Sequence, residues 1–183
     1  VVEAEVTGFL RATEDLIALF TTQFGSVNEN LFEARSLGVE GIVQGGRSDG
    51  KLNVQANGTW LDLRNSSESG EFGAFNGDRI PNRPWLFASG TARTRWPLPM
   101  RDTAITGFWT TRYTGAFTRN WESVSNPAVQ LAHGAGVGLL WNRDGRDAAF
   151  TAELQNLTDA TLFDVFGVQR PGRAVFAKLS TTW

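Results

Sequence analysis

The stretch from Arg173 to Trp183, RAVFAKLSTTW, decides the fold of this chain. Apolar residues recur at every second position of it and polar residues lie between them, so an extended strand here has one apolar and one polar face. The apolar row runs through Val175, Ala177 and Leu179 to the terminal aromatic ring. A strand of about ten residues with this pattern is what a transmembrane β-barrel requires in lipid. The stretch therefore predicts a barrel strand.

The composition is compatible with a barrel and excludes other classes. Cysteine is absent from the 183 residues, so disulfides and thiolate metal sites are excluded. No apolar run approaches the ~18 residues of a membrane-spanning helix. The mean hydropathy of −0.22 does not argue against a barrel, because half of each barrel strand is polar. The formal charge of −2 and the even spread of basic residues predict no nucleic-acid partner.

Nine segments show this alternation, and the clearest runs from Leu52 to Trp60. They are longer than the about 5–6 residues of an average globular strand. The predicted strands are 1–11, 14–23, 32–45, 50–64, 84–96, 101–115, 128–142, 146–157 and 173–183.

The links between these segments alternate in length. Short links rich in Gly, Asp, Asn and Pro suit tight hairpins, and they lie at 11–14, 46–49, 97–100 and 142–145. Long links lie at 22–31, 65–83, 116–127 and 158–172. Short turns on one rim and long loops on the other are typical of outer-membrane barrels, whose turns face the periplasm. A soluble sandwich has no reason to sort its loops in this way.

Aromatic residues lie near the predicted strand ends, where an amphipathic ring would meet the headgroup layer of a membrane. They are Trp60, Trp96, Trp109, Tyr113, Trp141 and Trp183. The alternative is that these rings form the core of a soluble β-sandwich. The strand lengths and the sorted loops favour the barrel.

A barrel in lipid must close, because each unpaired backbone group at an open edge costs several kcal/mol. Nine antiparallel strands would leave the first and last strands parallel at the seam, whereas bacterial single-chain barrels have an even number of strands. We therefore expect another polypeptide segment to complete the barrel.

Three stretches carry a family resemblance. Asn30 to Gln44, NLFEARSLGVEGIVQ, resembles the N-x-x-x-A-R-x-x-G-V-E strand of TonB-dependent outer-membrane receptors. Arg79 to Trp85, RIPNRPW, is similar to their R-(L/I)-P-x-x-P motif. Leu154 to Trp183 resembles their C-terminal N-L-(T/F)-(D/N) motif, followed by P-G-R-x-(F/V) and a last strand that ends on an aromatic residue.

This resemblance implies an all-β transmembrane antiparallel barrel of about 22 strands with a globular plug in its lumen. Residues 1–183 would supply the last nine strands. The implied partners are the N-terminal plug and barrel segment, TonB acting through that segment, and outer-membrane lipid. The implied protein is integral to the outer membrane of a Gram-negative bacterium. It actively imports a scarce nutrient, by default a ferric siderophore or similar metal chelate, with no resident cofactor and no enzyme activity.

The orientation follows from the same resemblance, since the chains of this family end in the periplasm. Counting nine strands back places Val1 at the extracellular rim. Loop tips are preferred sites of nicking, so we expect Val1 to follow a cut or mobile surface loop.

Motifs for catalysis or nucleotide binding find little support. His133 has no Ser/Asp pairing visible in the sequence, and a position facing lipid headgroups or a neighbouring strand suits it better. The glycines between Gly134 and Gly138 recur at every second residue and no helix follows, so they predict room for a plug and not a dinucleotide loop. Arg93 and Arg95 are expected to line the lumen, facing that plug.

Binding is expected in the long loops and the upper lumen. Aromatic rings combined with amides and guanidinium groups suit a bulky, partly apolar or anionic ligand. The candidate substrate-binding residues are Phe72, Phe75, Asn76, Arg79, Asn82, Phe117, Arg119, Trp121, Phe163 and Phe166. The alternative is that these rings pack loop against loop. The rival functions are a passive porin-like channel, an outer-membrane hydrolase, and a barrel receptor adapted to protein or saccharide cargo, adhesion or export.

Overall fold

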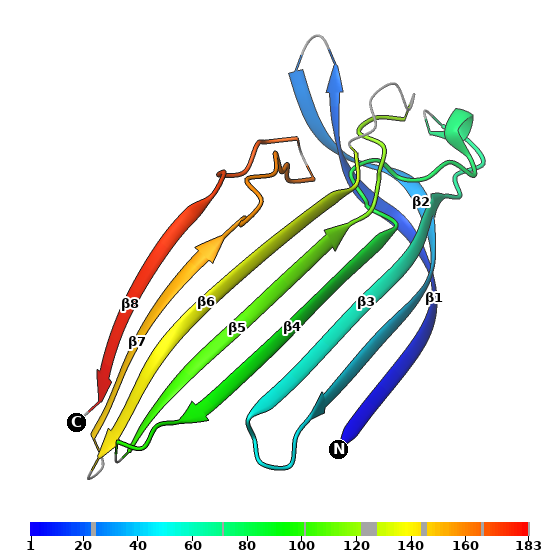
Figure 1. Ribbon diagram of the computed structural model, residues 1–183. Helices are drawn as coiled ribbons and strands as arrows, with labels where there is room; N and C mark the ends of the chain where they lie inside the picture. Colours follow the sequence, from blue (N-terminus) through cyan, green and yellow to red (C-terminus); the bar gives the residue numbers. More distant parts are fainter. Residues whose placement is uncertain are drawn as a thin grey trace.

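The computed structural model describes residues 1–22, 25–70, 72–100, 102–121, 128–143, 146–165 and 167–182, with the side chains of 17–32 and 143–146 outside this description. Among these residues, eight antiparallel strands form one curved sheet in which neighbours in sequence are neighbours in space (Figure 1). The strands are β1 (Val2–Thr22), β2 (Gly25–Gly46), β3 (Leu52–Asn65), β4 (Leu86–Pro97), β5 (Thr103–Thr114), β6 (Gln130–Arg143), β7 (Arg146–Gln155) and β8 (Ala174–Thr182). A short 3₁₀ helix, η1 (Gly73–Phe75), follows β3. No helix in the described ranges is long and apolar enough to cross a membrane.

The prediction of nine strands is wrong at the N-terminal end. The predicted turn at 11–14 lies inside the continuous strand β1, and the predicted long link at 22–31 is mostly part of β2. The register between β1 and β2 shifts after Thr13 and again after Leu16, and Asp15 has a φ of 54°. A β-bulge changes the phase of the alternation without ending the strand. The sequence pattern therefore breaks at a bulge, and not at a turn.

The predicted position of Val1 at the rim of the long loops is also wrong. The N-terminus and the end of β8 both lie at the rim of the short turns, with the N-terminus beside the turn that joins β2 to β3 (Figure 1). Val2 pairs with Gly45, and the Gly46 backbone N–H donates to the Val1 carbonyl at 3.2 Å. The bulge also explains this error. Because the predicted strands 1–11 and 14–23 form the single strand β1, Val1 lies one strand fewer from the C-terminus and therefore at the opposite rim.

The sorting of short turns and long loops onto opposite rims is as predicted, apart from the link between β1 and β2. The turns after β2 and β4 lie at the lower rim of Figure 1, and the loops after β3, β5 and β7 lie at the upper rim. Residues 144 and 145 of the predicted turn at 142–145 lie outside the described residues, as do 122–127 of the predicted loop at 116–127. In the turn after β2, the backbone N–H of Lys51 and the guanidinium of Arg47 lower the pKa of Asp49.

The cross-strand register gives the sheet one apolar and one polar face, because directly paired residues project on the same side. One row of the apolar face runs through Val2, Gly45, Val54, Ala92, Trp109, Ala135, Leu154 and Val175. Large side chains on this face stay exposed, among them Val6 at 75% and Leu179 at 72%. A β-sandwich would cover such a face with a second sheet, and the described residues form none. The exposed apolar face therefore fits a barrel wall in lipid.

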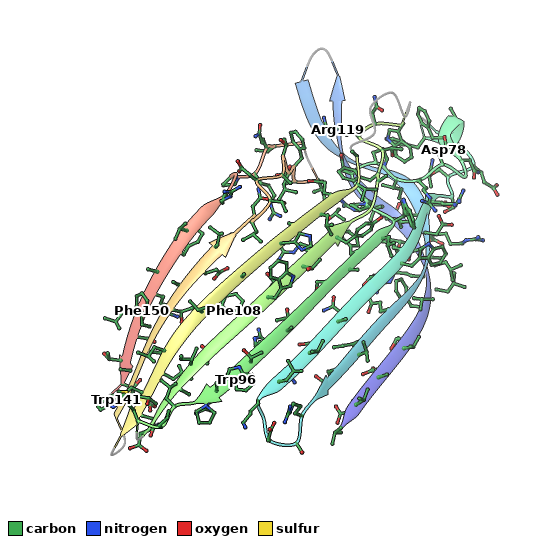
Figure 2. All side chains as sticks on the ribbon, viewed as in Figure 1. Asp78, Trp96, Phe108, Arg119, Trp141 and Phe150 are labelled. Atoms are coloured by element: carbon green, nitrogen blue, oxygen red, sulfur yellow. The ribbon has the colours of Figure 1, made fainter. Side chains whose placement is uncertain are left out.

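Aromatic residues bound this apolar face at both rims. Trp96 and Trp141 lie near the lower rim (Figure 2), and Trp60 and Tyr113 lie toward the upper ends of their strands. On β4, Leu86 is the partner of Trp60 and lies ten residues from Trp96. Ten residues span about 33 Å of strand, which at a tilt of about 40° matches the apolar band of about 25 Å in outer-membrane barrels. Trp183 lies outside the described residues.

The glycine row of β6 lies on the polar face but does not leave empty space. A Cβ atom on Gly136 would collide with the Phe108 ring of β5, its direct cross-strand partner. A Cβ on Gly134 or Gly138 would lie within 2.8 Å of a threonine hydroxyl of β5. Side chains of β5 therefore fill the space directly beside these glycines, as when an aromatic ring covers a glycine in a sheet. Room for a plug in the lumen stays a prediction.

Candidate functional site

The loop between β3 and β4 is anchored by buried contacts at the upper rim. The Asn65 side chain donates from Nδ2 to the Phe72 carbonyl at 2.6 Å and accepts from the Ser67 N–H at 2.9 Å. Phe72 is 3% exposed and packs with Ala34 of β2 and Ile80. Phe72, a predicted site residue, therefore forms part of the loop's own core.

Trp121 joins this loop to the one after β5. Its ring lies 5.3 Å from both the Phe72 ring, at a tilt, and the Phe75 ring, in a stack. Three of the predicted aromatic site residues thus come together from two loops. Ring pairs at this separation add about 0.5–1.5 kcal/mol beyond the burial of area. The predicted alternative of loop-on-loop packing describes these contacts.

Arg79 is held by a carboxylate that the sequence reasoning missed. Its Nη2 lies 3.0 Å from Asp62 Oδ1, and Arg64 Nε lies 2.8 Å from Asp62 Oδ2. The Arg79 guanidinium also lies over the Trp85 ring at 5.8 Å. Alternation in β3 puts Asp62 on the face of Trp60, and nothing local in the sequence shows that a residue 17 positions away reaches it.

The loops after β5 and β7 meet at Arg119. Its guanidinium lies 5.7 Å from the centre of the Phe163 ring, and a Cβ on Gly167 would come within 3.2 Å of Arg119 Cζ. The Phe163 N–H donates to Gln130 Oε1 at 2.5 Å. Arg119 Nε is buried and has no hydrogen-bond partner within the described part of the chain.

The remaining predicted residues are spread over the same rim. Asn82 has a φ of 58° and its N–H donates to the Thr118 carbonyl at 2.7 Å, which ties two loops together. Phe117 is 5% exposed and Asn76 is exposed. Phe166 lies outside the described residues.

A groove of about 440 Å³ opens on the polar face below the loop that joins β7 to β8. Arg112, Glu153 and Phe176 line it from the strands, and Leu162 and Arg170 line it from the loop. The Gln155 side-chain amide, also in the lining, donates to Glu153 Oε1 at 2.9 Å. The sequence reasoning missed this groove because it depends on the register of strands such as β5 and β8, which are 60 residues apart in the chain.

A smaller depression of about 260 Å³ lies on the polar face of β1, β2 and β3. Its lining includes the carboxylates of Glu5 and Glu40. Arg93 and Arg95 project from the same face of β4, where both are exposed. The polar face is therefore negative at β1 and β2 and positive at β4.

His133 lies on the apolar face against a neighbouring strand, which is one of the two positions predicted for it. Its Nδ1 lies 3.0 Å from Thr111 Oγ1, which also accepts a bond from Trp109 Nε1 at 3.0 Å. The Trp109 and His133 rings are 5.5 Å apart. Among the residues whose positions are described, no group of three or more His, Asp or Glu side chains could hold a metal ion.

Comparisons with known proteins give structural relatives only. No family model and no curated protein matches the sequence. The ferric preacinetobactin receptor BauA from Acinetobacter baumannii aligns with 98% of this chain at 14% identity and a TM-score of 0.78. The ferric yersiniabactin uptake receptor FyuA from Yersinia pestis aligns with 98% at 18% identity and a TM-score of 0.69, and the copper transporter OprC aligns with 97% at 15% identity and a TM-score of 0.67.

These relatives are TonB-dependent receptors of the outer membrane, so the resemblance read from the sequence and the predicted barrel fold are confirmed at the level of the fold. The chain spans 26–28% of the length of each of them. The sheet of this chain thus has the fold of part of a receptor barrel.

Proposed function

We propose that this chain is the C-terminal barrel portion of a TonB-dependent outer-membrane receptor that actively imports a scarce nutrient, such as a ferric siderophore or a similar metal chelate. The observation that carries the proposal is the alignment of 98% of the chain with a ferric siderophore receptor at a TM-score of 0.78. The exposed apolar face and the sorted loops support it independently.

The edges of the sheet support a partner polypeptide. In the described part of the chain, the outer edges of β1 and β8 pair with no strand. Lipid cannot satisfy their backbone groups, so further strands must close the barrel. We assign these strands, the plug and the TonB-binding segment to the polypeptide that precedes residues 1–183, which makes the barrel about 22 strands in total.

The ligand is proposed to contact the upper rim of the barrel. Asn76, Arg79, Asn82, Trp121 and Phe163 are accessible there. Arg119 belongs to the same proposed surface, with Phe75 stacked on Trp121. Phe166 is included from the sequence alone, because it lies outside the described residues. The buried rings of Phe72 and Phe117 would act from beneath, by fixing the loops that present these groups.

Uptake by cells that make the whole receptor tests this function. Iron delivered as a chelate should enter cells with TonB and should stop entering when TonB, or the segment of the receptor that binds it, is deleted. Entry that persists without TonB and saturates at no concentration would instead indicate a passive channel. Recovery of residues 1–183 alone as a folded, monodisperse protein in plain buffer would overturn the barrel itself.

A further inference from the structure

We propose that the groove below the loop between β7 and β8 binds the anionic part of the imported chelate, with Arg112 and Arg170 as the partners of its carboxylate or catecholate oxygens. This inference rests on the proposed function and deepens it, since it names the ligand's charge and the residues that recognise it. The groove has a volume of about 440 Å³, and sites for small molecules begin at about 300 Å³.

Arg112 has an unobstructed position in the groove. On the polar face, its direct cross-strand partners are Ser89 of β4 and Ala132 of β6. Both side chains are too short to cover a guanidinium group, and Arg112 is exposed. A planar guanidinium that projects from a strand can form paired hydrogen bonds with a carboxylate or with two adjacent oxygens of a catecholate.

Arg170 enters the same groove from the loop side, and its backbone is fixed. Its N–H donates to the Leu162 carbonyl at 2.8 Å. The loop is held further by Asn156, whose side chain exchanges two hydrogen bonds with the Ala160 backbone, and by Asp159, which accepts from the Arg173 N–H at 2.8 Å. A loop ordered before the ligand arrives loses less conformational entropy when the ligand binds.

The charges in the groove favour an anion. Glu153 is the carboxylate in the lining, and the Gln155 amide already donates to it. Within the described residues, neither Arg112 nor Arg170 takes part in an ion pair. The lining therefore carries an excess of positive charge, whereas Arg79 at the rim is already paired with Asp62.

The groove also has a place for the organic part of a chelate. Phe176 from β8 and Leu162 from the loop line it beside the polar groups. The predicted rim aromatics Phe72 and Phe117 are 3% and 5% exposed, so they are committed to packing within the loops. Compared with the loops of the upper rim, the groove therefore combines guanidinium groups outside ion pairs with an accessible aromatic ring.

The test uses the purified whole receptor in detergent and two iron complexes of similar size. Ferric tris-catecholate is anionic and ferric tris-hydroxamate is neutral, and binding of each is followed by quenching of tryptophan fluorescence. We expect the anionic complex to bind at least tenfold more tightly. Arg112→Gln and Arg170→Gln should each weaken it about tenfold and leave the neutral complex within about twofold, because a charge-assisted hydrogen bond is lost in each variant.

Arg95→Gln is the matched control, since it removes the same charge from the same face. Arg95 pairs with Thr106, six residues along β5 from Arg112, so it lies about 20 Å below the groove. The affinity of the Arg95→Gln receptor for the anionic complex should stay within about twofold of the wild-type value. Arg112→Lys, which keeps the charge but not the paired geometry, should fall between the wild type and Arg112→Gln.

Several results would overturn this assignment. Equal affinity for the two complexes, or binding of neither, would do so. The assignment would also fail if Arg95→Gln weakened binding of the anionic complex as much as the groove variants do, because the positive charge of the whole face would then be responsible. The shift in gel mobility on heating reports whether each variant has a folded barrel. Uptake that still depends on TonB would show that the proposed function survives a failure of the groove assignment.

Discussion

The two faces of the sheet differ in what determines their side chains. On the apolar face, which faces outward, most side chains are small or aliphatic, and Val6 and Leu179 are among those left exposed. The contacts of His133 with Thr111 and Trp109 are an exception on this face. On the inward face, the side chains depend on their partners, as where the Phe108 ring lies on Gly136. The outward face is therefore determined mainly by the medium around it, whereas the inward face is determined by specific neighbouring side chains.

The largest expected effect comes from a charge placed on the outward face. Ala56 lies midway between Leu52 and Trp60 on the apolar face of β3, and its neighbour Gln55 lies on the polar face. In the whole receptor, Ala56→Arg should cost about 2–4 kcal/mol of unfolding free energy, because the guanidinium would enter hydrocarbon. Gln55→Arg should cost less than about 1 kcal/mol. Denaturant unfolding in lipid bilayers measures both, and equal costs would contradict the assignment of the faces.

An intermediate effect is expected from a methyl group added on the inward face. Gly136→Ala should destabilise the receptor by about 1–3 kcal/mol, since the new Cβ would collide with the Phe108 ring. Adding Phe108→Ala should recover part of this loss, although the Ala152 carbonyl at 2.9 Å would still be crowded. Gly41 faces outward, with its nearest atom 3.9 Å from an added Cβ, so Gly41→Ala is the control and should be close to neutral. Unfolding of the single and double variants decides, and a neutral Gly136→Ala would show that the inward face is not closely packed.

The smallest effect is expected where the outward face leaves the membrane. Asp62 lies two residues beyond Trp60 and pairs with Arg64 and Arg79. Because these side chains are 20–46% exposed, the pairs are screened by water. Asp62→Asn should therefore cost less than about 1 kcal/mol, and the cost should shrink further in high salt. A cost comparable to that of Ala56→Arg would place the upper edge of the hydrocarbon layer above Asp62.

Most of the strand pattern was predictable because it is local. Alternation identified β3 to β8 and their faces, since successive side chains of a strand must point to opposite sides. It failed at Thr13 to Leu16, where a bulge shifts the phase while the strand continues, and this error moved Val1 to the wrong rim. Periodicity cannot separate a bulge from a turn, because both interrupt it in the same way.

The candidate site was predictable in part. The loops were correctly expected at one rim, and the structure brings Phe72, Phe75 and Trp121 together there. Their packing against one another, the pairing of Asp62 with Arg79 and the groove at Arg112 were not predictable. Each joins residues that are distant in sequence, so each depends on how strands are aligned and not on what any strand contains.

The sequence by itself determined that the chain forms long strands with one face suited to lipid, because a period of two residues is a property of the extended backbone alone. The tertiary structure decided the strand count of the described part, the rim at which its ends lie, and which polar groups share the groove. These depend on register, which is fixed by a bulge and by cross-strand contacts such as Phe108 on Gly136. Such contacts form between segments that are distant in the chain, so the local sequence of one segment does not indicate its partner.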